Sequence, residues 1–291
     1  MNIKMCFIHL ANCKAATINT NIAAIKARSN LERVQRDMDT SIARLSSGKR
    51  ITRAHDDAAG SAIVGRMDSQ IRGLTMGIRH AKDGQSFVDT AEGALQEISG
   101  IFQRMRELAV QASSGVIHNS DKDYLNVEME ALADEITAID ANTKFNDRTV
   151  FTSTAMNFYT DIDVAGTAIT TPGLEMSAAA TPGFTKSVVK IDNTIAQAGL
   201  SSVVSAIDVA IAYVDDKRSR LGAISNRFDH VVDNLTNVVA NTESARSRIE
   251  DADFAVETTQ LTRNTVLQQA ATSMVAQANA QKNSILALIQ G

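Results

Sequence analysis

Large aromatic rings and helix-breaking prolines are both scarce in this chain. It has no tryptophan, two prolines among 291 residues, and only 4% aromatic residues. Hydrophobic residues nevertheless make up 44%, much of it Ala, Ile, Leu and Val. Few rings argue against a thick globular core, and few prolines leave helices uninterrupted. This amino-acid composition therefore predicts long helices that pack along narrow apolar faces.

Cysteines are also few, and both lie near the start of the chain. Because Cys6 and Cys13 are the only two, disulfides cannot hold the whole fold together. With His9 they form a C-x2-H-x3-C cluster, but three ligands without a second cluster are weak evidence for a metal. The apolar patch beside them is shorter than the ~7–15 residues of a signal peptide. We expect 1–14 to be an atypical extension rather than a metal site or a cleaved leader.

Strong charge imbalance, membrane spans and catalytic motifs are missing as well. A net charge of −4 gives no argument for binding nucleic acid or an anionic membrane. No apolar run approaches the ~20 residues of a transmembrane helix. The five histidines are scattered, and no H-E-x-x-H, glycine-rich phosphate loop or nucleophile elbow occurs. We expect no enzyme, no catalytic residue, no metal and no cofactor.

One acidic pair, Asp56 and Asp57, leaves two interpretations open. Paired carboxylates could serve acid–base or metal chemistry. They also suit the start of a helix, where they accept hydrogen bonds from free amides. We favour the second interpretation because no other acidic or histidine cluster accompanies the pair.

The two ends of the chain carry matching helical patterns. Polar residues at 18–21 are suited to cap a helix, and Gly48 is suited to end it. Apolar residues recur between them, and a heptad pattern recurs near the other end. The N-terminal set is Leu31, Val34, Met38, Ile42 and Leu45; the C-terminal set is Leu267, Ala271, Met274, Ala278, Ile285 and Leu288. We expect the two ends to pair as antiparallel helices that become ordered mainly when neighbouring subunits cover them.

The middle of the chain predicts three further helices and a small β region. Helices are expected at about 58–114, 121–141 and from 201 onward, each with apolar residues at helical spacing. Five glycines within 73–100 indicate bends or close helix packing. Turn signals at 171–173 and 181–183, with an apolar run at 188–191, predict short β-hairpins within about 142–199. The predicted fold class is mainly α: a long antiparallel helical bundle or coiled coil formed by both chain ends, with a small β-hairpin region in the middle.

Several local sequences resemble bacterial flagellins, in the order of that family. These are NTN at 19–21, IARLSSGKRI at 42–51, DDAAG at 56–60, QRMRELAVQA at 103–112, SARSRI at 244–249, DADF at 251–254 and LQQA at 267–270. The resemblance covers most of the chain outside the middle and implies a short flagellin without large variable outer domains. It implies a structural subunit that self-assembles into the flagellar filament for motility after export through the flagellar type III channel.

The resemblance also implies a domain division. Residues 15–47 and 255–291 correspond to the inner terminal-helix domain, and 48–56 and 246–254 correspond to connectors. Residues 57–245 correspond to the outer helical domain. Flagellins usually begin a residue or two before the position of 15–18 here, so 1–14 is a departure from the family pattern.

The partners implied by the resemblance are further copies of the chain, the export apparatus and an export chaperone. The filament cap and the hook-associated junction proteins are implied too. The implied location of this chain is the extracellular flagellar filament. A host innate immune receptor is a further implied partner, and the positions that match its motif are Arg104, Leu108, Gln111 and Glu128. Two alternatives remain open: a hook–filament junction protein, and a surface adhesin on a flagellin frame that binds glycans through the β region.

Overall fold

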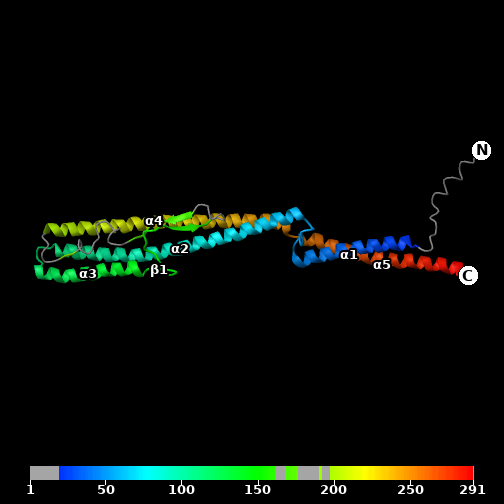
Figure 1. Ribbon diagram of the computed structural model, residues 1–291, viewed down its shortest axis with the longest axis horizontal. Helices are drawn as coiled ribbons and strands as arrows, with labels where there is room; N and C mark the ends of the chain where they lie inside the picture. Colours follow the sequence, from blue (N-terminus) through cyan, green and yellow to red (C-terminus); the bar gives the residue numbers. More distant parts are fainter. Residues whose placement is uncertain (1–19, 161–167, 176–189, 192–196, 291) are drawn as a thin grey trace, which may run out of the picture. The chain divides into compact units, whose positions relative to one another are not determined.

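The described part of the chain is mostly helical. The computed structural model describes residues 20–160, 168–175, 190–191 and 197–290, with the side chains of 197–198 and 281–290 excepted. Its helices are α1 (Ile22–Ser47), α2 (Ala58–Ala112), α3 (Asn119–Asn142), α4 (Gln197–Glu250) and α5 (Phe254–Gln290) (Figure 1). Its strands are β1 (Lys144–Phe145), β2 (Arg148–Thr149), β3 (Met156–Tyr159) and β4 (Ala168–Thr171). This confirms the mainly α class with a small β-hairpin region in the middle.

The chain divides into two compact units. The first unit joins both chain ends, Met1–Arg66 and Ala245–Gly291, and the second is Met67–Ser244. Helix α4 continues to Glu250, so the connector expected at 246–254 is irregular only at 251–253. None of the helices described here is both long and apolar enough to cross a membrane.

Helix α1 begins and ends at the residues that its sequence predicts. The Asn21 side-chain oxygen accepts a hydrogen bond from the Ala24 amide at 3.0 Å, which satisfies one free amide of the first turn. Gly48 has a φ of 70°, and its amide donates to the Arg44 carbonyl at 2.8 Å. A left-handed residue at this position closes the last turn, and glycine adopts it without strain.

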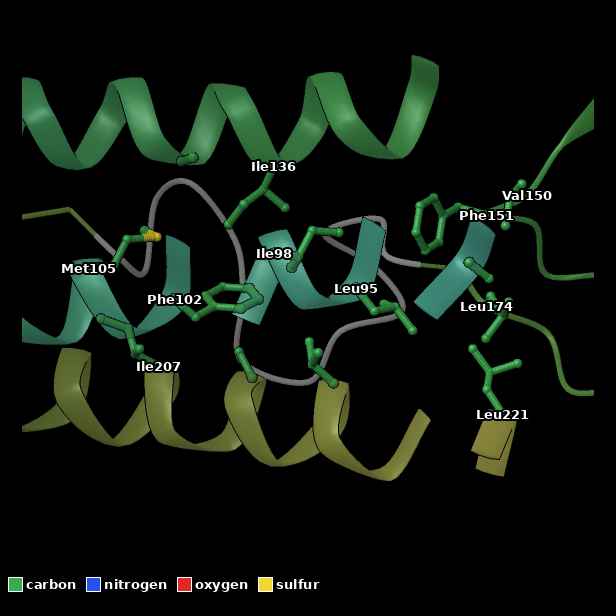
Figure 2. Close-up of a cluster of buried hydrophobic side chains, with 14 of the residues drawn as sticks. Leu95, Ile98, Phe102, Met105, Ile136, Val150, Phe151, Leu174, Ile207 and Leu221 are labelled. Atoms are coloured by element: carbon green, nitrogen blue, oxygen red, sulfur yellow. The ribbon is translucent and has the colours of Figure 1, made fainter. Parts of the chain in front are cut away.

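The second unit has a continuous apolar core between α2, α3 and α4 (Figure 2). Long side chains from the three helices meet there, and Phe102 and Met105 are fully buried. The apolar residues at helical spacing in the second half of α2 are buried, as expected for a packed helix: they are Leu95, Ile98, Phe102, Met105, Ala109 and Ala112, each at most 1% exposed. The apolar residues at helical spacing in α4 are buried from Val203 to Phe228, whereas Val238 is 39% exposed.

An aromatic cluster joins the β region to these helices. Phe158 of β3 lies with its ring centroid 5.8 Å from that of Phe87 in α2 and 5.7 Å from that of Phe228 in α4. Gly77 in α2 also approaches this region closely, because a Cβ built there would lie 2.3 Å from the Thr160 carbonyl oxygen. Two of the helical glycines, Gly77 and Gly84, therefore mark close packing, as the sequence suggests.

The β-hairpins are short and antiparallel. In the first, Lys144 pairs with Thr149, and the turn residues Asn146 and Asp147 have φ values of 50° and 61°, which fits the tight turn preferred by two-residue hairpins. In the second, β3 pairs with β4 from Met156–Thr171 to Tyr159–Ala168. The strand expected at 188–191 is not found at 190–191, and 188–189, like the turn at 181–183, lies outside the described residues.

A lysine in the apolar face of α4 holds the loop after β4. Lys217 donates to the Gly173 carbonyl at 2.9 Å, and its ammonium lies 4.9 Å from the ring centroid of Tyr213. The Tyr213 hydroxyl in turn donates to the Glu175 carbonyl at 3.1 Å. Lys217, a polar residue between the buried Val214 and Leu221, thus binds a backbone carbonyl rather than leaving its charge unpaired.

Candidate assembly surface

Helices α1 and α5 pack against each other in antiparallel orientation (Figure 1). At one end of the pair, the Asn21 side-chain amide donates to the Ala278 carbonyl at 3.0 Å. At the other end, Arg44 Nη1 lies 2.9 Å from Glu257 Oε1. Residue numbers that rise along α1 meet numbers that fall along α5, so the helices are antiparallel. The two contacts also define which residues of α1 lie beside which residues of α5, that is, the register.

The α1 side of this contact has a regular heptad spacing. Ala43 and Arg44 are half-buried near the end of α1. The other buried and half-buried positions of α1 recur at heptad spacing, and we call them the α1 seam: Ala24, Ala27, Leu31, Val34, Met38, Ser41 and Leu45. Four of the five predicted residues lie in it. The exception is Ile42, which is 47% exposed, while its neighbour Ser41 is 5% exposed.

The α5 side has the same spacing but a different phase from the predicted one. Its buried and half-buried positions, the α5 seam, are Glu257, Leu261, Asn264, Gln268, Ala271, Val275 and Ala278. Ala271 and Ala278 were predicted, but Leu267 and Met274 are 45% and 64% exposed. The spacing of apolar residues in the sequence does not predict these seam positions, because three of them are polar. Ile285 and Leu288 belong to the part of α5 whose side chains lie outside the described residues.

The pair leaves a substantial apolar surface uncovered within the chain. The exposed large apolar residues are Ile22, Ile25 and Ile42 on α1, and Phe254, Val256, Val266, Leu267 and Met274 on α5. Val256, Leu267 and Met274 are spaced by eleven and seven residues, so they share one flank of α5 beside its seam. Exposed apolar residues that share one flank of a helix are candidates for an interaction site.

The connectors that lead to the two helices bind each other. Lys49 and Asp251 form an antiparallel bridge. The Arg50 amide donates to the Glu250 carbonyl at 2.6 Å, and the Ala252 amide donates to the Gly48 carbonyl at 2.9 Å. The ammonium of Lys49 also lies 2.5 Å from Glu250 Oε1. The chain therefore enters and leaves the α1–α5 pair side by side.

The acidic pair after α1 has structural roles. Asp57 accepts a hydrogen bond from the Gly60 amide at 2.9 Å and caps α2, as expected. Asp56 instead accepts from the Thr52 hydroxyl at 2.9 Å and from the Thr52 and Arg53 amides at 3.1 and 3.0 Å. These hydrogen bonds, the Thr52 hydroxyl first, lower the pKa of Asp56 because they favour its charged form. Among the described residues, no cluster of three or more His, Cys, Asp or Glu could hold a metal.

The residues predicted to meet an immune receptor separate into exposed and buried members. Arg104 donates to Glu128 Oε1 from Nε and Nη2 at 3.0 and 2.8 Å, and to Glu107 Oε2 at 3.2 Å. The Glu128 and then the Glu107 hydrogen bonds raise the pKa of Arg104. Gln111 is exposed, but Leu108 is 1% exposed and lies in the core. The structure brings Arg104 and Glu128 together and assigns Leu108 to packing, since its side chain is not accessible.

A cavity of about 560 Å³ lies beside the β-hairpins. Its lining includes Lys144, Arg148, Thr152 and Met156. None of the described residues that line it is aromatic.

Comparisons with known proteins agree with this architecture. A family model described as bacterial flagellin N-terminal helical region matches residues 18–155, and one described as bacterial flagellin C-terminal helical region matches 204–289. A flagellin of Halalkalibacterium halodurans is 39% identical over 276 residues, which cover 94% of this chain and 99% of that protein.

Two further proteins are similar to this chain over different extents. The flagellin of Bacillus subtilis is 35% identical over 302 residues, with 94% of this chain and 99% of that protein covered. A crystal structure of Bacillus cereus flagellin aligns with a TM-score of 0.47 and 29% identity, covering 56% of this chain and 94% of that one. The two family models together match more than half of the chain, and the curated relatives match nearly all of it. The chain belongs to the bacterial flagellin family and is a structural subunit of the flagellar filament.

Proposed function

We propose that this flagellin polymerises through the exposed apolar surface of its α1–α5 pair. The observation that carries the proposal is the set of large apolar side chains that the pair leaves uncovered, including Ile25, Leu267 and Met274. Covering them with neighbouring subunits removes apolar area from water at roughly 25 cal/mol per Å². The gain recurs in every subunit of a helical polymer, which favours a long filament.

On this proposal the two chain ends form the inner tube of the filament. Residues 15–47 and 255–291 occupy that tube, and 57–245 form the layer around it. The bridged connectors, 48–56 and 251–253, carry the chain between the two layers. The predicted residues Leu31, Val34, Met38 and Leu45 hold α1 on α5, whereas Ile42, Leu267 and Met274 meet neighbouring copies.

The proposed location is extracellular, after export through the flagellar type III channel. The partners are then the export apparatus and a chaperone before assembly, and the cap and hook-associated junction proteins at the filament ends. A host innate immune receptor is a further proposed partner, and its contact is formed by the exposed residues Arg104, Gln111 and Glu128.

Electron microscopy of purified protein, seeded or salted out, tests the assembly proposal. We expect long filaments from the intact chain and none from a chain that lacks 255–291. The deleted chain must retain the circular dichroism signal of α2, α3 and α4. If the intact chain stays monomeric with a folded second unit, the proposal is overturned and the junction-protein alternative is tested with flagellar hook fragments.

A further inference from the structure

The contact between α1 and α5 contains an ion pair where a coiled coil ordinarily has apolar residues. Glu257 occupies a seam position of α5, and its side chain is only 9% exposed. Its partner Arg44, at 2.9 Å, has a side chain that is 28% exposed. Removing one partner of a buried ion pair is strongly destabilising, because the remaining charge loses its compensation. This contact is therefore sensitive to the alignment of the two helices.

The positions of the two charges in their helices add to this sensitivity. Arg44 lies in the last turn of α1, and Glu257 lies in the first turn of α5. A cation at a helix C-terminus and an anion at a helix N-terminus are both favoured by the helix dipoles. In an antiparallel pair, only one register brings these two turns together.

The apolar seam residues discriminate poorly between registers. Both seams repeat every seven residues, so a slip of one heptad brings seam positions against seam positions again. The apolar members of the α5 seam include the small residues Ala271 and Ala278, which fit against most neighbours. A slip in one direction places Asn264 beside Arg44, and a slip in the other places Glu257 near Met38. Each slipped register separates the ion pair.

We propose that the ion pair between Arg44 and Glu257 sets the register of α1 against α5, together with the adjacent connector bridge of Lys49 and Asp251. The inference rests on the proposed role of the α1–α5 pair in the filament, and it gives these two residues a positioning role within it. A register error of one heptad displaces the exposed apolar residues by about 10 Å, at 1.5 Å per residue. Subunits in different registers would present different surfaces, so the ion pair makes all copies alike.

Disulfide trapping between the two helices measures the register directly. The parent chain carries Cys6→Ser and Cys13→Ser. Ala24→Cys with Val275→Cys reports the observed register, because the Asn21–Ala278 hydrogen bond brings these turns together. Ala24→Cys with Gln268→Cys reports a slip of one heptad. Filaments are oxidised and dissolved, and a non-reducing gel separates intramolecular products from cross-linked dimers.

The test variant replaces both charges with apolar residues, Arg44→Met with Glu257→Leu. Exchange of a buried ion pair for apolar residues of similar volume is often neutral or stabilising, so the helices should still pair. In the parent we expect the in-register product to exceed the slipped product about tenfold or more, which corresponds to about 1.4 kcal/mol. In the variant we expect the excess of the in-register product to fall at least threefold, while the bridged connectors keep some preference for the observed register. Gln269→Leu, which adds a leucine to an exposed face of α5 away from Leu267 and Met274, is the matched control and should behave as the parent does.

Each result has a defined meaning. A variant that keeps the parent's tenfold preference overturns the proposal, as does a parent that forms both products equally. If the variant does not polymerise alone, it is copolymerised with an excess of the parent chain that lacks the introduced cysteines, and the ratio is measured in those filaments. A parent that forms the in-register product but no filaments contradicts the proposed function and leaves the register assignment in place.

Discussion

Gly84 of α2 lies directly against the ring of Phe228 of α4. A Cβ built on Gly84 would lie 2.5 Å from Phe228 Cζ and 3.1 Å from a ring carbon of Phe158. The two rings contact each other edge to face at a centroid distance of 5.7 Å. Neither ring can move away without disturbing the other, so glycine at position 84 allows close approach of α2 and α4.

Gly84→Ala should therefore destabilise the second unit. Forcing an extra methyl group into a packed core costs about 1–3 kcal/mol. Gly93 in the same helix is the matched control, because a Cβ there meets nothing within 4 Å. Gly93→Ala should raise the free energy of unfolding by about 1 kcal/mol through helix propensity. Denaturant unfolding followed by circular dichroism compares the two, and equal stabilities would contradict the packing argument.

The apolar faces of the second unit could be predicted from sequence because burial there depends on apolar residues at helical spacing. Leu95, Ile98 and Phe102 follow this spacing without interruption, and all three are fully buried. The caps at Asn21 and Gly48 could also be predicted from the sequence, because each depends on the chemistry of one residue.

The phase of α5 could not be predicted in this way. Its seam includes Glu257, Asn264 and Gln268, so the apolar pattern followed Leu267 and Met274 on the flank instead. The position of Glu257 depends on Arg44, which is 213 residues earlier in the sequence. Leu108 is a different case: the family resemblance implied a receptor contact, but an apolar residue in α2 also suits packing, and the structure buries it to 1% exposure.

Leu267→Ala should impair polymerisation without unfolding the subunit. The side chain is 45% exposed in the single chain, so its loss there should cost no more than about 0.5 kcal/mol. Where neighbouring copies bury it fully, truncation costs about 2–5 kcal/mol in every subunit. The critical concentration for filament growth, measured by sedimentation, should rise at least tenfold.

Gln269→Ala is the control for that experiment, because Gln269 is exposed on a different face of α5. Its critical concentration should stay close to that of the unmodified chain. An unchanged critical concentration for Leu267→Ala would exclude this flank of α5 from the assembly contact.

Acid should loosen the connector between α1 and α2 through Asp56. Its hydrogen bonds to Thr52 and Arg53 lower its pKa below the ordinary 3.8, so they stabilise the connector above that value. That contribution is lost as the pH falls through the lowered pKa, because a protonated carboxyl binds the amides less well. NMR titration should give a pKa below 3.8 for Asp56 and show the Thr52 and Arg53 amides exchanging faster at the acid end. Asp56→Asn should remove the pH dependence of both amides, and persistence of that dependence would assign it to another group.

Arg104→Ala should weaken activation of the host innate immune receptor. Buried arginines at interface centres contribute about 2 kcal/mol or more, so a cell reporter should require roughly tenfold or more of the variant monomer. Arg106→Ala is the matched control, since Arg106 is similarly exposed and is also ion-paired, to Asp208 at 2.6 Å. Equal losses in the two variants would indicate a general effect of ion-pair removal rather than a receptor contact.

Hydrogen exchange should show different amide exchange rates in the two units of the monomer. Few of the described side chains are buried in the α1–α5 pair. On α1 only Val34 and Ser41 are below 10% exposure, and the buried positions of α5 up to residue 280 are the polar residues Glu257 and Asn264. The second unit has a core of fully buried residues such as Phe87, Phe102 and Phe228. Ordering each backbone residue costs about 1–2 kcal/mol, which so small a contact offsets poorly. We therefore expect the amides of α1 and α5 to exchange in dilute monomer far faster than those of α2 between 87 and 109, and to become protected in filaments. Full protection of both terminal helices in the monomer would show that the pair is stable without neighbouring subunits, and assembly would then join preformed surfaces instead of ordering the chain ends.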